Sequence, residues 1–432
     1  MTSSSLAHRP SRLRSALRRQ LVRAPGAVAT IAAAQLLATS LWFSASSEAA
    51  RLIQLWHAPA QAAGWMSSAV QLGFIVGTLG LSLGGLADRF AASSMFLLSA
   101  VAGAAINAWL ALVPGSLATG LINRGLLGVC LAGIYPLGMK LMVTWEPDRA
   151  GSALAQLVAM LTLGTAMPLV LHVLGSGISW RWVLAAASWF ALAAACMMAV
   201  LGDGPHAVDP RRSAPREPTS VGARFTVGLQ AFRIRGVRRA AFGYFGHMWE
   251  LYAFWVAVPI LVQRSGIASG APARSVWLIA AGIIAMGALG CLIGGALSRR
   301  FGSHRVAAAA LAASACCCAA FAVAWRSGNH GLLLGLLLAW GGTVVADSPQ
   351  FSAATARACP KTLLGSALAL QNAIGFGITV VAIPLITSAL LRFGLDATWL
   401  LLPGPLLGLA GFVPALRGTA PEVVPAPRPT KF

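Results

Sequence analysis

His247 and Glu250 are the residues whose types and spacing most directly suggest chemistry. They stand three positions apart within the apolar run 239–263, so on a helix they share one face. Counted from Arg239, Glu250 lies about 16 Å along such a helix. If the run crosses a membrane, an ionised carboxylate at that depth costs on the order of 3 kcal/mol. This cost favours the neutral, protonated form, so that the carboxyl can bind and release a proton. The alternative is a structural pair that holds this helix to a neighbour.

Asp347 and Arg124 are two further charged residues inside apolar runs. Asp347 precedes Pro349, whose missing N–H predicts a kink, and it fits a gate or ion contact as well as a structural partner for an arginine. Arg124 lies about 10 Å from one end of its run, so it should face protein or a wet cavity unless it snorkels to the surface. The candidates for proton coupling are therefore Glu250, His247, Asp347 and Arg124.

Uncharged polar and aromatic residues within the runs form a second group, the candidates for a solute cavity. Each of them alone is more often an interhelical hydrogen bond than a ligand contact. They are Gln35, Thr39, Trp42, Gln71, Tyr135, Tyr252, Gln371 and Asn372.

The elements that must position these residues are long apolar segments. Apolar residues make up 57% of the chain and charged residues 10%, and the mean hydropathy is +0.75, which indicates a membrane protein. A spanning helix needs about 20 predominantly apolar residues. We predict an all-α membrane protein with twelve transmembrane helices, at 26–46, 63–87, 94–113, 117–144, 151–176, 182–201, 239–263, 276–297, 306–325, 331–355, 364–388 and 397–416.

A short hydrophilic turn occurs twice between such runs, about 210 residues apart. The first copy reads Gly84-Gly85-Leu86-Ala87-Asp88-Arg89-Phe90, and the second reads Gly295-Ala296-Leu297-Ser298-Arg299-Arg300-Phe301. A second echo repeats Gly151-Ser152-Ala153-Leu154-Ala155 at Gly365-Ser366-Ala367-Leu368-Ala369. Two echoes at nearly one offset indicate that a half-length unit was duplicated, which predicts two pseudo-symmetric six-helix bundles.

The first turn resembles the loop signature G-x-L-A-D-R-x-G-R-K of the major facilitator superfamily, and Arg124 with Gly128 resembles its R-x-x-x-G signature. The resemblance implies a transporter whose halves are parallel repeats. It also implies an inner-side latch, in which Asp88 contacts the N-terminus of the eleventh helix near Ser366. The expected gate residues are Gly84, Asp88, Arg89 and Arg299. Ala91, Ala92 and Ser93 depart from the signature, and Arg299 replaces the acid in the second copy, so the latch should be weaker and one-sided.

The formal charge of +21 is distributed unequally between the two sides of the membrane. Arginine and lysine collect in alternate loops, and this positive-inside pattern predicts that both termini are cytoplasmic. The same surface should bind anionic lipid headgroups, whereas nucleic-acid binding is not expected. The expected organisation is a basic tail (1–24), a first half (25–201), a cytoplasmic linker (202–238), a second half (239–418) and a tail (419–432).

Enzymatic chemistry is not expected, because the chain shows no nucleophile–base pair, no metal-ligand cluster and no phosphate-binding loop. The seven cysteines are not placed for a disulfide on the outer side. We therefore predict no cofactor and no metal.

The sequence as a whole predicts a monomeric secondary transporter in a bacterial inner membrane, which moves a small organic solute and is coupled to protons. Two alternatives stay open at this stage. One is an exporter of a toxic compound or drug, and the other is a transport-inactive membrane receptor or scaffold of the same fold. A scaffold would tolerate the loss of the buried charges, whereas a transporter would not.

The predicted topology can be tested with reporter fusions. Fusions at Ala207 and at the C-terminus should report the cytoplasm, and a fusion at Gly270 should report the opposite side, because the basic loops stay inside. A periplasmic signal from Ala207 would overturn the helix count.

Overall fold

The computed structural model describes residues 12–23, 26–147, 150–175, 179–207, 226 and 228–413. Helices are the only regular secondary structure in these ranges. Ten described helical stretches are long and apolar enough to cross a membrane, or eleven if α1 and α2 are one bent span. One stretch, 363–412, has 50 residues, about twice the length of one crossing.

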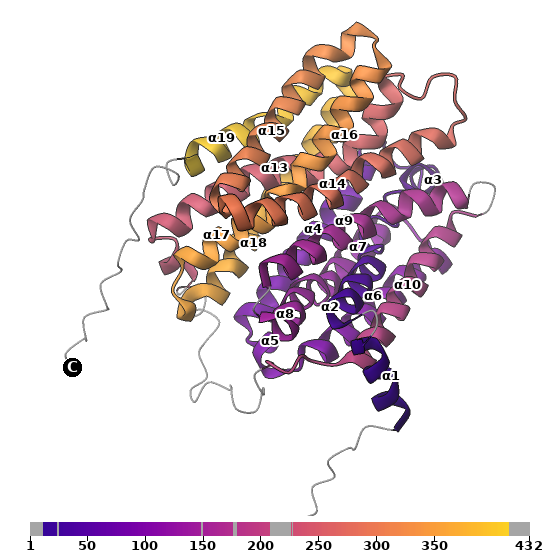
Figure 1. Cartoon of the computed structure of the whole chain (residues 1–432). Helices are drawn as coiled ribbons and strands as arrows, with labels where there is room; N and C mark the ends of the chain where they lie inside the picture. Colours follow the sequence, from indigo (N-terminus) through magenta and orange to yellow (C-terminus); the bar gives the residue numbers. More distant parts are fainter. Residues whose placement is uncertain are drawn as a thin grey trace, which may run out of the picture.

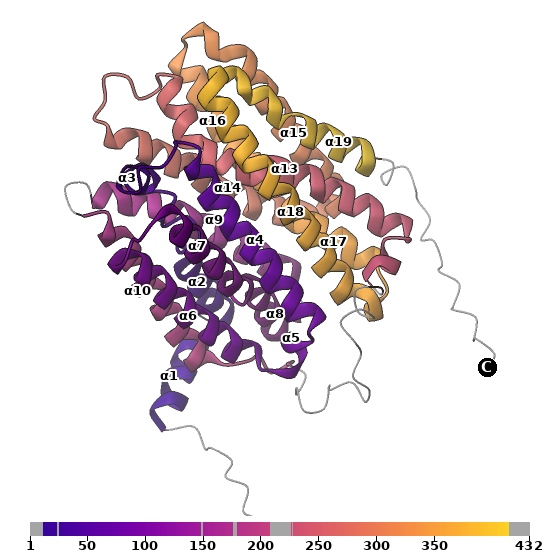
Figure 2. The same ribbon diagram turned by 180° about the vertical axis from the view of Figure 1, so that it is seen from behind.

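The helices form two groups that follow each other along the chain (Figures 1 and 2). The first group contains α1 (Arg12–Arg23), α2 (Ala27–Thr39), α3 (Ala49–Leu55), α4 (Ala62–Leu83), α5 (Leu86–Arg89), α6 (Ala92–Leu112), α7 (Leu117–Ala132), α8 (Tyr135–Trp145), α9 (Ala150–Leu174) and α10 (Arg181–Leu201). The second contains α13 (Arg235–Arg264), α14 (Arg274–Phe301), α15 (Ser303–Ala324), η2 (Trp325–Ser327), α16 (His330–Ala346), α17 (Ser348–Ala358), α18 (Lys361–Phe393), η3 (Gly394–Leu401) and α19 (Pro403–Phe412). We call the end with α5 inner and the opposite end outer, following the predicted orientation.

The 50-residue stretch contains two crossings, because the chain turns back after α18. Trp249 of α13 donates its indole N–H to the carbonyl of Leu400 at 2.8 Å. Further along, a β-carbon built on Gly411 would lie 2.6 Å from Cβ of Phe242. Residue numbers rise along α13 as they fall along α19, so the two helices are antiparallel. With the first crossing added, the fold confirms the prediction of twelve spans.

The first crossing differs from the continuous helix predicted at 26–46. Helix α2 ends at Thr39, and successive turns occupy 40–48 before α3 begins. The hydroxyls of Ser40 and Ser44 donate to carbonyls three residues earlier, at 2.6 and 2.9 Å. Serines that bond to the local backbone in this way compete with the helical hydrogen bonds. A serine-rich sequence therefore interrupts the helix.

Two other breaks in the helices occur just before a proline. Helices α16 and α17 meet at Asp347, which confirms the kink predicted from Pro349. The run 117–144 was predicted as one helix, but α7 and α8 separate just before Pro136, whose ring and missing N–H disrupt the preceding turn. The predicted boundary between 94–113 and 117–144 is confirmed: α6 ends at Leu112, and α7 begins after Pro114 with a capping box from Ser116.

Of the predicted domain boundaries, much of the linker and the C-terminal tail lie outside the described residues. Helix α13 begins at Arg235, inside the predicted linker, and α1 lies within the predicted N-terminal tail.

The two halves repeat one packing contact. A β-carbon on Gly73 of α4 would lie 1.8 Å from the carbonyl oxygen of Gly125 on α7, and one on Gly290 of α14 would lie 1.8 Å from that of Gly342 on α16. Gly290 follows Gly73 by the same number of residues as Gly342 follows Gly125. The same backbone-on-backbone contact at equivalent positions supports two pseudo-symmetric bundles.

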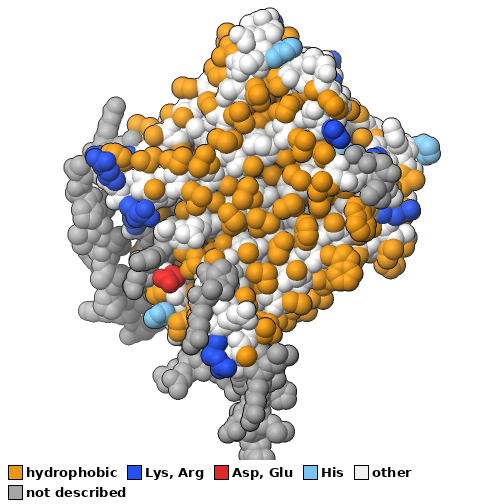
Figure 3. All heavy atoms as spheres, turned by 45° about the vertical axis from the view of Figure 1, so that its right-hand side comes forward, with side chains coloured by type: hydrophobic (Ala, Val, Ile, Leu, Met, Phe, Trp, Pro, Cys, Tyr) orange, Lys and Arg blue, Asp and Glu red, His pale blue; other side chains and the backbone are white. Residues whose placement is uncertain are grey.

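The halves meet along two helix pairs, α4 with α18 and α9 with α14. Ser68 of α4 donates to the carbonyl of Val380 at 3.2 Å. On the other pair, a β-carbon on Gly295 would lie 2.7 Å from Cβ of Ala155. The surface away from these seams is apolar, as one face shows in Figure 3, with Lys and Arg near its margins.

Substitution of Gly73 by alanine should destabilise the protein, because the carbonyl of Gly125 occupies the place of the added methyl group. We expect a loss of about 1–3 kcal/mol, measured as a lower melting temperature of the purified protein. Gly80→Ala is the matched control on the same helix, since a β-carbon there meets nothing within 4 Å. Equal effects of the two substitutions would contradict the close packing of α4 on α7.

Candidate functional site

Asp347 lies at the break between α16 and α17, where it meets His247 of α13. Both side chains are buried, and His247 Nδ1 is 2.8 Å from Asp347 Oδ1. The two atoms are close enough for an ion pair but do not have good hydrogen-bond geometry. His247 Nε2 and Asp347 Oδ2 have no hydrogen-bond partner. The pair therefore keeps polar atoms that are available to a proton, a water molecule or a ligand.

Glu250 lies one turn further along α13 with a different set of partners. Ser314 of α15 donates to its Oε2 at 2.8 Å, and the indole N–H of Trp340 on α16 donates to its Oε1 at 2.7 Å. The carboxyl is fully buried. Both of its partners are neutral, so the contacts accommodate a charged carboxylate without neutralising it.

The expected pairing of His247 with Glu250 is not what the structure contains. Residues three apart on a helix are separated by about 60° around its axis. That angle turns His247 toward the α16–α17 break and Glu250 toward α15 and α16. Neighbouring positions of α13 thus carry two ionisable residues with separate partners.

Arg124 lies apart from this group, on α7 in the first half. One guanidinium nitrogen donates to Oδ1 of Asn107 at 3.0 Å, and another donates to the carbonyl of Leu41 at 2.9 Å. Asn107 also accepts from Ser44 at 2.7 Å. The arginine thus supplies donors to the turns that interrupt the first crossing. It faces protein, as predicted, and its part in proton coupling stays a prediction.

An aromatic cluster fills the centre, where the halves meet. Trp42 and Phe74 of the first half contact Tyr252 and Phe376 of the second, with ring centroids 5.6 Å apart for Trp42–Tyr252 and 4.3 Å apart for Phe74–Phe376. Trp42 and Tyr252 were predicted for the cavity, and they do meet. The two phenylalanines were missed, because an apolar residue in an apolar run carries no sequence signal.

Three glutamines, from helices of both halves, are fully buried. Neither amide atom of Gln35 or Gln71 has a hydrogen-bond partner. Gln371 accepts from Thr355 at 2.7 Å through Oε1, but its Nε2 has no partner. Buried amides are normally satisfied, so these atoms are the best donors and acceptors for a polar ligand.

The remaining predicted cavity residues lie nearby or pack between helices. Thr39 donates to the carbonyl of Gln35 at 2.7 Å and therefore bonds within its own helix. Tyr135 of α8 is half-buried. Asn372 is half-buried on α18.

The predicted inner gate is only partly described. Gly84 ends α4, and Gly85 adopts a positive φ of 67° that turns the chain into α5. Arg89 and Arg299 are exposed. The side chain of Asp88 lies outside the described residues, so the latch stays a prediction.

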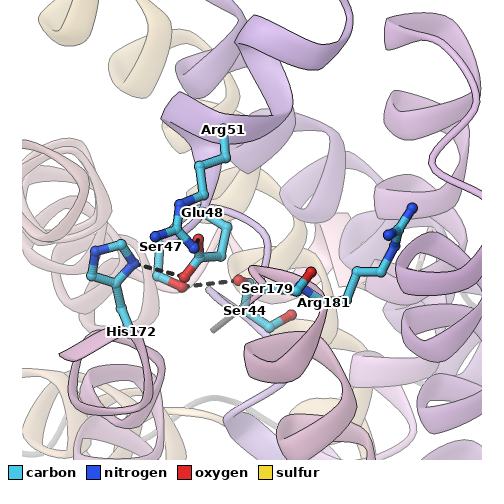
Figure 4. A network of polar contacts seen from close by, with 7 residues as sticks. All are labelled: Ser44, Ser47, Glu48, Arg51, His172, Ser179 and Arg181. Atoms are coloured by element: carbon cyan, nitrogen blue, oxygen red, sulfur yellow. Dashed lines mark hydrogen bonds and ion pairs between the residues drawn. The ribbon is translucent and has the colours of Figure 1, made fainter. Parts of the chain in front are cut away.

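The structure contains one more ionisable cluster, which the sequence analysis missed. Glu48, Arg51 and His172 point toward one another at the outer end of the first half (Figure 4). His172 Nδ1 is 2.6 Å from Glu48 Oε1. The two residues are 124 positions apart, so no local pattern in the sequence links them.

Comparison with known families agrees with this architecture. A family model described as Major Facilitator Superfamily matches residues 27–384, which is most of the chain. The chain belongs to the Major Facilitator Superfamily. It is thus a multi-pass membrane protein from a superfamily of secondary transporters, not of enzymes. No curated protein sequence matches it.

Solved structures of the same superfamily have the same fold. The E. coli fucose:proton symporter FucP is 15% identical to this chain, with a TM-score of 0.63. The match covers 91% of this chain and 98% of the FucP chain. FucP in an outward conformation is 16% identical to this chain, with a TM-score of 0.66. That match covers 91% of this chain and 99% of the FucP chain. At these identities the likeness concerns the fold alone.

Arg124→Gln should destabilise this superfamily member, because the carbonyl of Leu41 and the amide of Asn107 lose their donor in a buried place. An unsatisfied buried group costs about 1–3 kcal/mol, so the melting temperature of the purified protein should fall. The melting temperature of Arg124→Lys should fall less, since lysine keeps the charge but lacks the planar guanidinium group. Arg274→Gln at an exposed position is the control. Unchanged stability with lost transport would instead return Arg124 to the coupling group.

Proposed function

We propose that this protein is a secondary active transporter that moves a small organic solute by alternating access between its two halves. The observation that carries the proposal is the position of the aromatic cluster with the unpartnered glutamines. Side chains of both halves meet there, so a bound solute touches both. A solute that supplies partners to Gln35, Gln71 and Gln371 removes the cost of burying their amides.

The cluster also suggests how binding is linked to movement. Trp42 and Tyr252 stack across the interface at 5.6 Å, and rings in such contact exclude water. A solute between them separates the halves locally. The binding free energy can then favour one arrangement of the halves over the other, because only differential binding shifts such an equilibrium.

Protons are the proposed energy source, through Glu250 together with His247 and Asp347. These groups are buried within the second half, and the unpartnered His247 Nε2 and Asp347 Oδ2 support exchange of a proton there. A proton that crosses the membrane supplies about 2.3 kcal/mol per 100 mV. FucP, which shares the fold, is described as a fucose:proton symporter. Arg124 is assigned to holding the first crossing rather than to proton transfer.

The inner side is proposed to close through the predicted latch of Asp88 and the start of α18, with Gly84, Arg89 and Arg299 around it. Helix N-termini attract carboxylates through their free N–H groups. Loss of the contact would let the inner ends separate.

The proposed location is a bacterial inner membrane, with both termini cytoplasmic and the protein monomeric. Helix α1 supports an interaction with anionic lipids, since it carries five arginines with Leu13, Leu17 and Leu21 between them. Arg18 anchors it to the bundle by donating to the carbonyl of Leu201 at 2.8 Å. Basic segments of this kind bind acidic headgroups.

Glu250→Gln tests the coupling. A thermal-shift screen of metabolites first identifies a solute that stabilises the purified protein. In vesicles, the variant should still exchange that solute, because glutamine mimics the protonated acid and exchange needs no net proton movement. Uphill accumulation driven by a proton gradient should be lost.

Glu146→Gln, at an exposed carboxylate, is the matched control and should accumulate the solute normally. If Glu250 is only structural, the variant should lose stability and exchange together. Normal accumulation by Glu250→Gln would assign coupling to Asp347 with His247, and Asp347→Asn would then be the decisive variant.

A further inference from the structure

The outer cluster of Glu48, Arg51 and His172 lies beside the second half, and it has no part in the central site described above. Glu48 is the residue that precedes α3, Arg51 follows on α3, and His172 is in the last turn of α9. Trp277, in the first turn of α14, is the partner from the second half. The cluster thus lies where the outer ends of α9 and α14 meet.

Glu48 holds His172 in a fixed orientation. The carboxyl side chain is fully buried, whereas His172 keeps 17% of its side chain exposed. Besides the 2.6 Å contact with His172, Glu48 Oε2 lies 3.4 Å from Arg51 Nη1. Arg51 is 40% exposed, so solvent screens its charge more than that of Glu48. The buried carboxylate therefore fixes the position of the His172 ring from within the first half.

The imidazole of His172 packs against Trp277 with ring centroids 4.4 Å apart and an angle of 45° between the planes. This contact joins the two halves. A cation within about 6 Å of an indole centroid is attracted by the ring, and tryptophan is the strongest aromatic partner. A protonated His172 consequently holds Trp277 more strongly than a neutral one does.

We propose that Glu48, His172 and Trp277 form a proton-sensitive latch that holds the outer side closed. Outward opening separates the outer ends of the halves and breaks the contact of His172 with Trp277, while the pair of His172 with Glu48 stays within the first half. Protonation of His172 adds to the stability of the closed arrangement at low pH. That added stability is lost as the external pH rises and the imidazole becomes neutral.

The other charged groups near the cluster do not change charge in the relevant range. Histidine is the side chain that ordinarily titrates between about pH 5 and pH 8. Arg51 faces Glu48 from α3, Arg274 stands one turn before Trp277 on α14, and Arg181 at the start of α10 turns away to the carbonyl of Ala111. Arginine side chains do not lose their proton in this range, so His172 is the group that can switch.

The test measures opening of the outer side directly. A cysteine at Thr387, which is 3% exposed and next to Gly64 across the α4–α18 seam, becomes reactive toward a membrane-impermeant maleimide when the outer ends part. Its labelling rate in right-side-out vesicles is divided by that of a cysteine at the exposed Ala271, which corrects for the pH dependence of the thiol. The parent without either cysteine gives the background from the native thiols.

The normalised rate should fall about fivefold from about pH 8 to about pH 5, the size of a partly buried cation–π contact. His172→Gln and Trp277→Leu should each remove this pH response and label at the faster, high-pH rate. Trp277→Phe should keep part of it, and Glu48→Gln should weaken it, because His172 loses the carboxylate that fixes its ring. An unchanged response in both His172→Gln and Trp277→Leu would overturn the proposal.

The proposal rests on the proposed function only through the opening and closing of the outer side. The labelling assay needs no solute and no proton gradient. A lost pH response therefore counts against the latch, whereas a lack of coupled accumulation counts against the transporter mechanism.

Discussion

A polar group inside a membrane must find a partner in the protein, because the hydrocarbon offers none. This constraint divides the buried polar residues of the chain into two classes. Arg124 and Glu250 have partners for their polar atoms, and they stabilise the interrupted first crossing and the packing of α13. Gln35, Gln71 and the His247–Asp347 pair keep atoms without partners. The atoms of the second class are the ones that a solute or a proton can satisfy, and the proposed function relies on them. Glu250 is proposed as a proton site on different grounds, because it is buried and has only neutral partners.

The sequence predicted what depends on local chemistry. The kink at Asp347 follows from Pro349, and the count of twelve spans follows from hydropathy alone. The partner of His247 could not be predicted, since it depends on the 60° between neighbouring positions and on which helices surround α13. The turns after Thr39 were missed for a related reason. Serines interrupt a helix only where the freed carbonyls find another donor, here Arg124, which is far away in the sequence.

The two halves share their packing but not their chemistry. The glycine contacts of α4 with α7 recur between α14 and α16, as expected when backbone geometry is inherited by both copies. The ionisable residues do not recur: the second half buries two acids and a histidine at its centre, while the first half places its buried acid, Glu48, at the outer end. Duplication therefore supplies a symmetric frame, within which the buried ionisable residues differ between the halves in type and position.

The position of these groups along the membrane normal suggests an order of events. A proton from outside meets His172 first, because it is partly exposed at the outer end, while Glu250 and Asp347 are fully buried. If a proton on His172 favours closure, the acid medium that protonates it also limits how long the outer side stays open. Under the proposed function, a closed outer side would keep the central acids from exchanging protons with the outside. The outer contact and the central groups would then act one after the other.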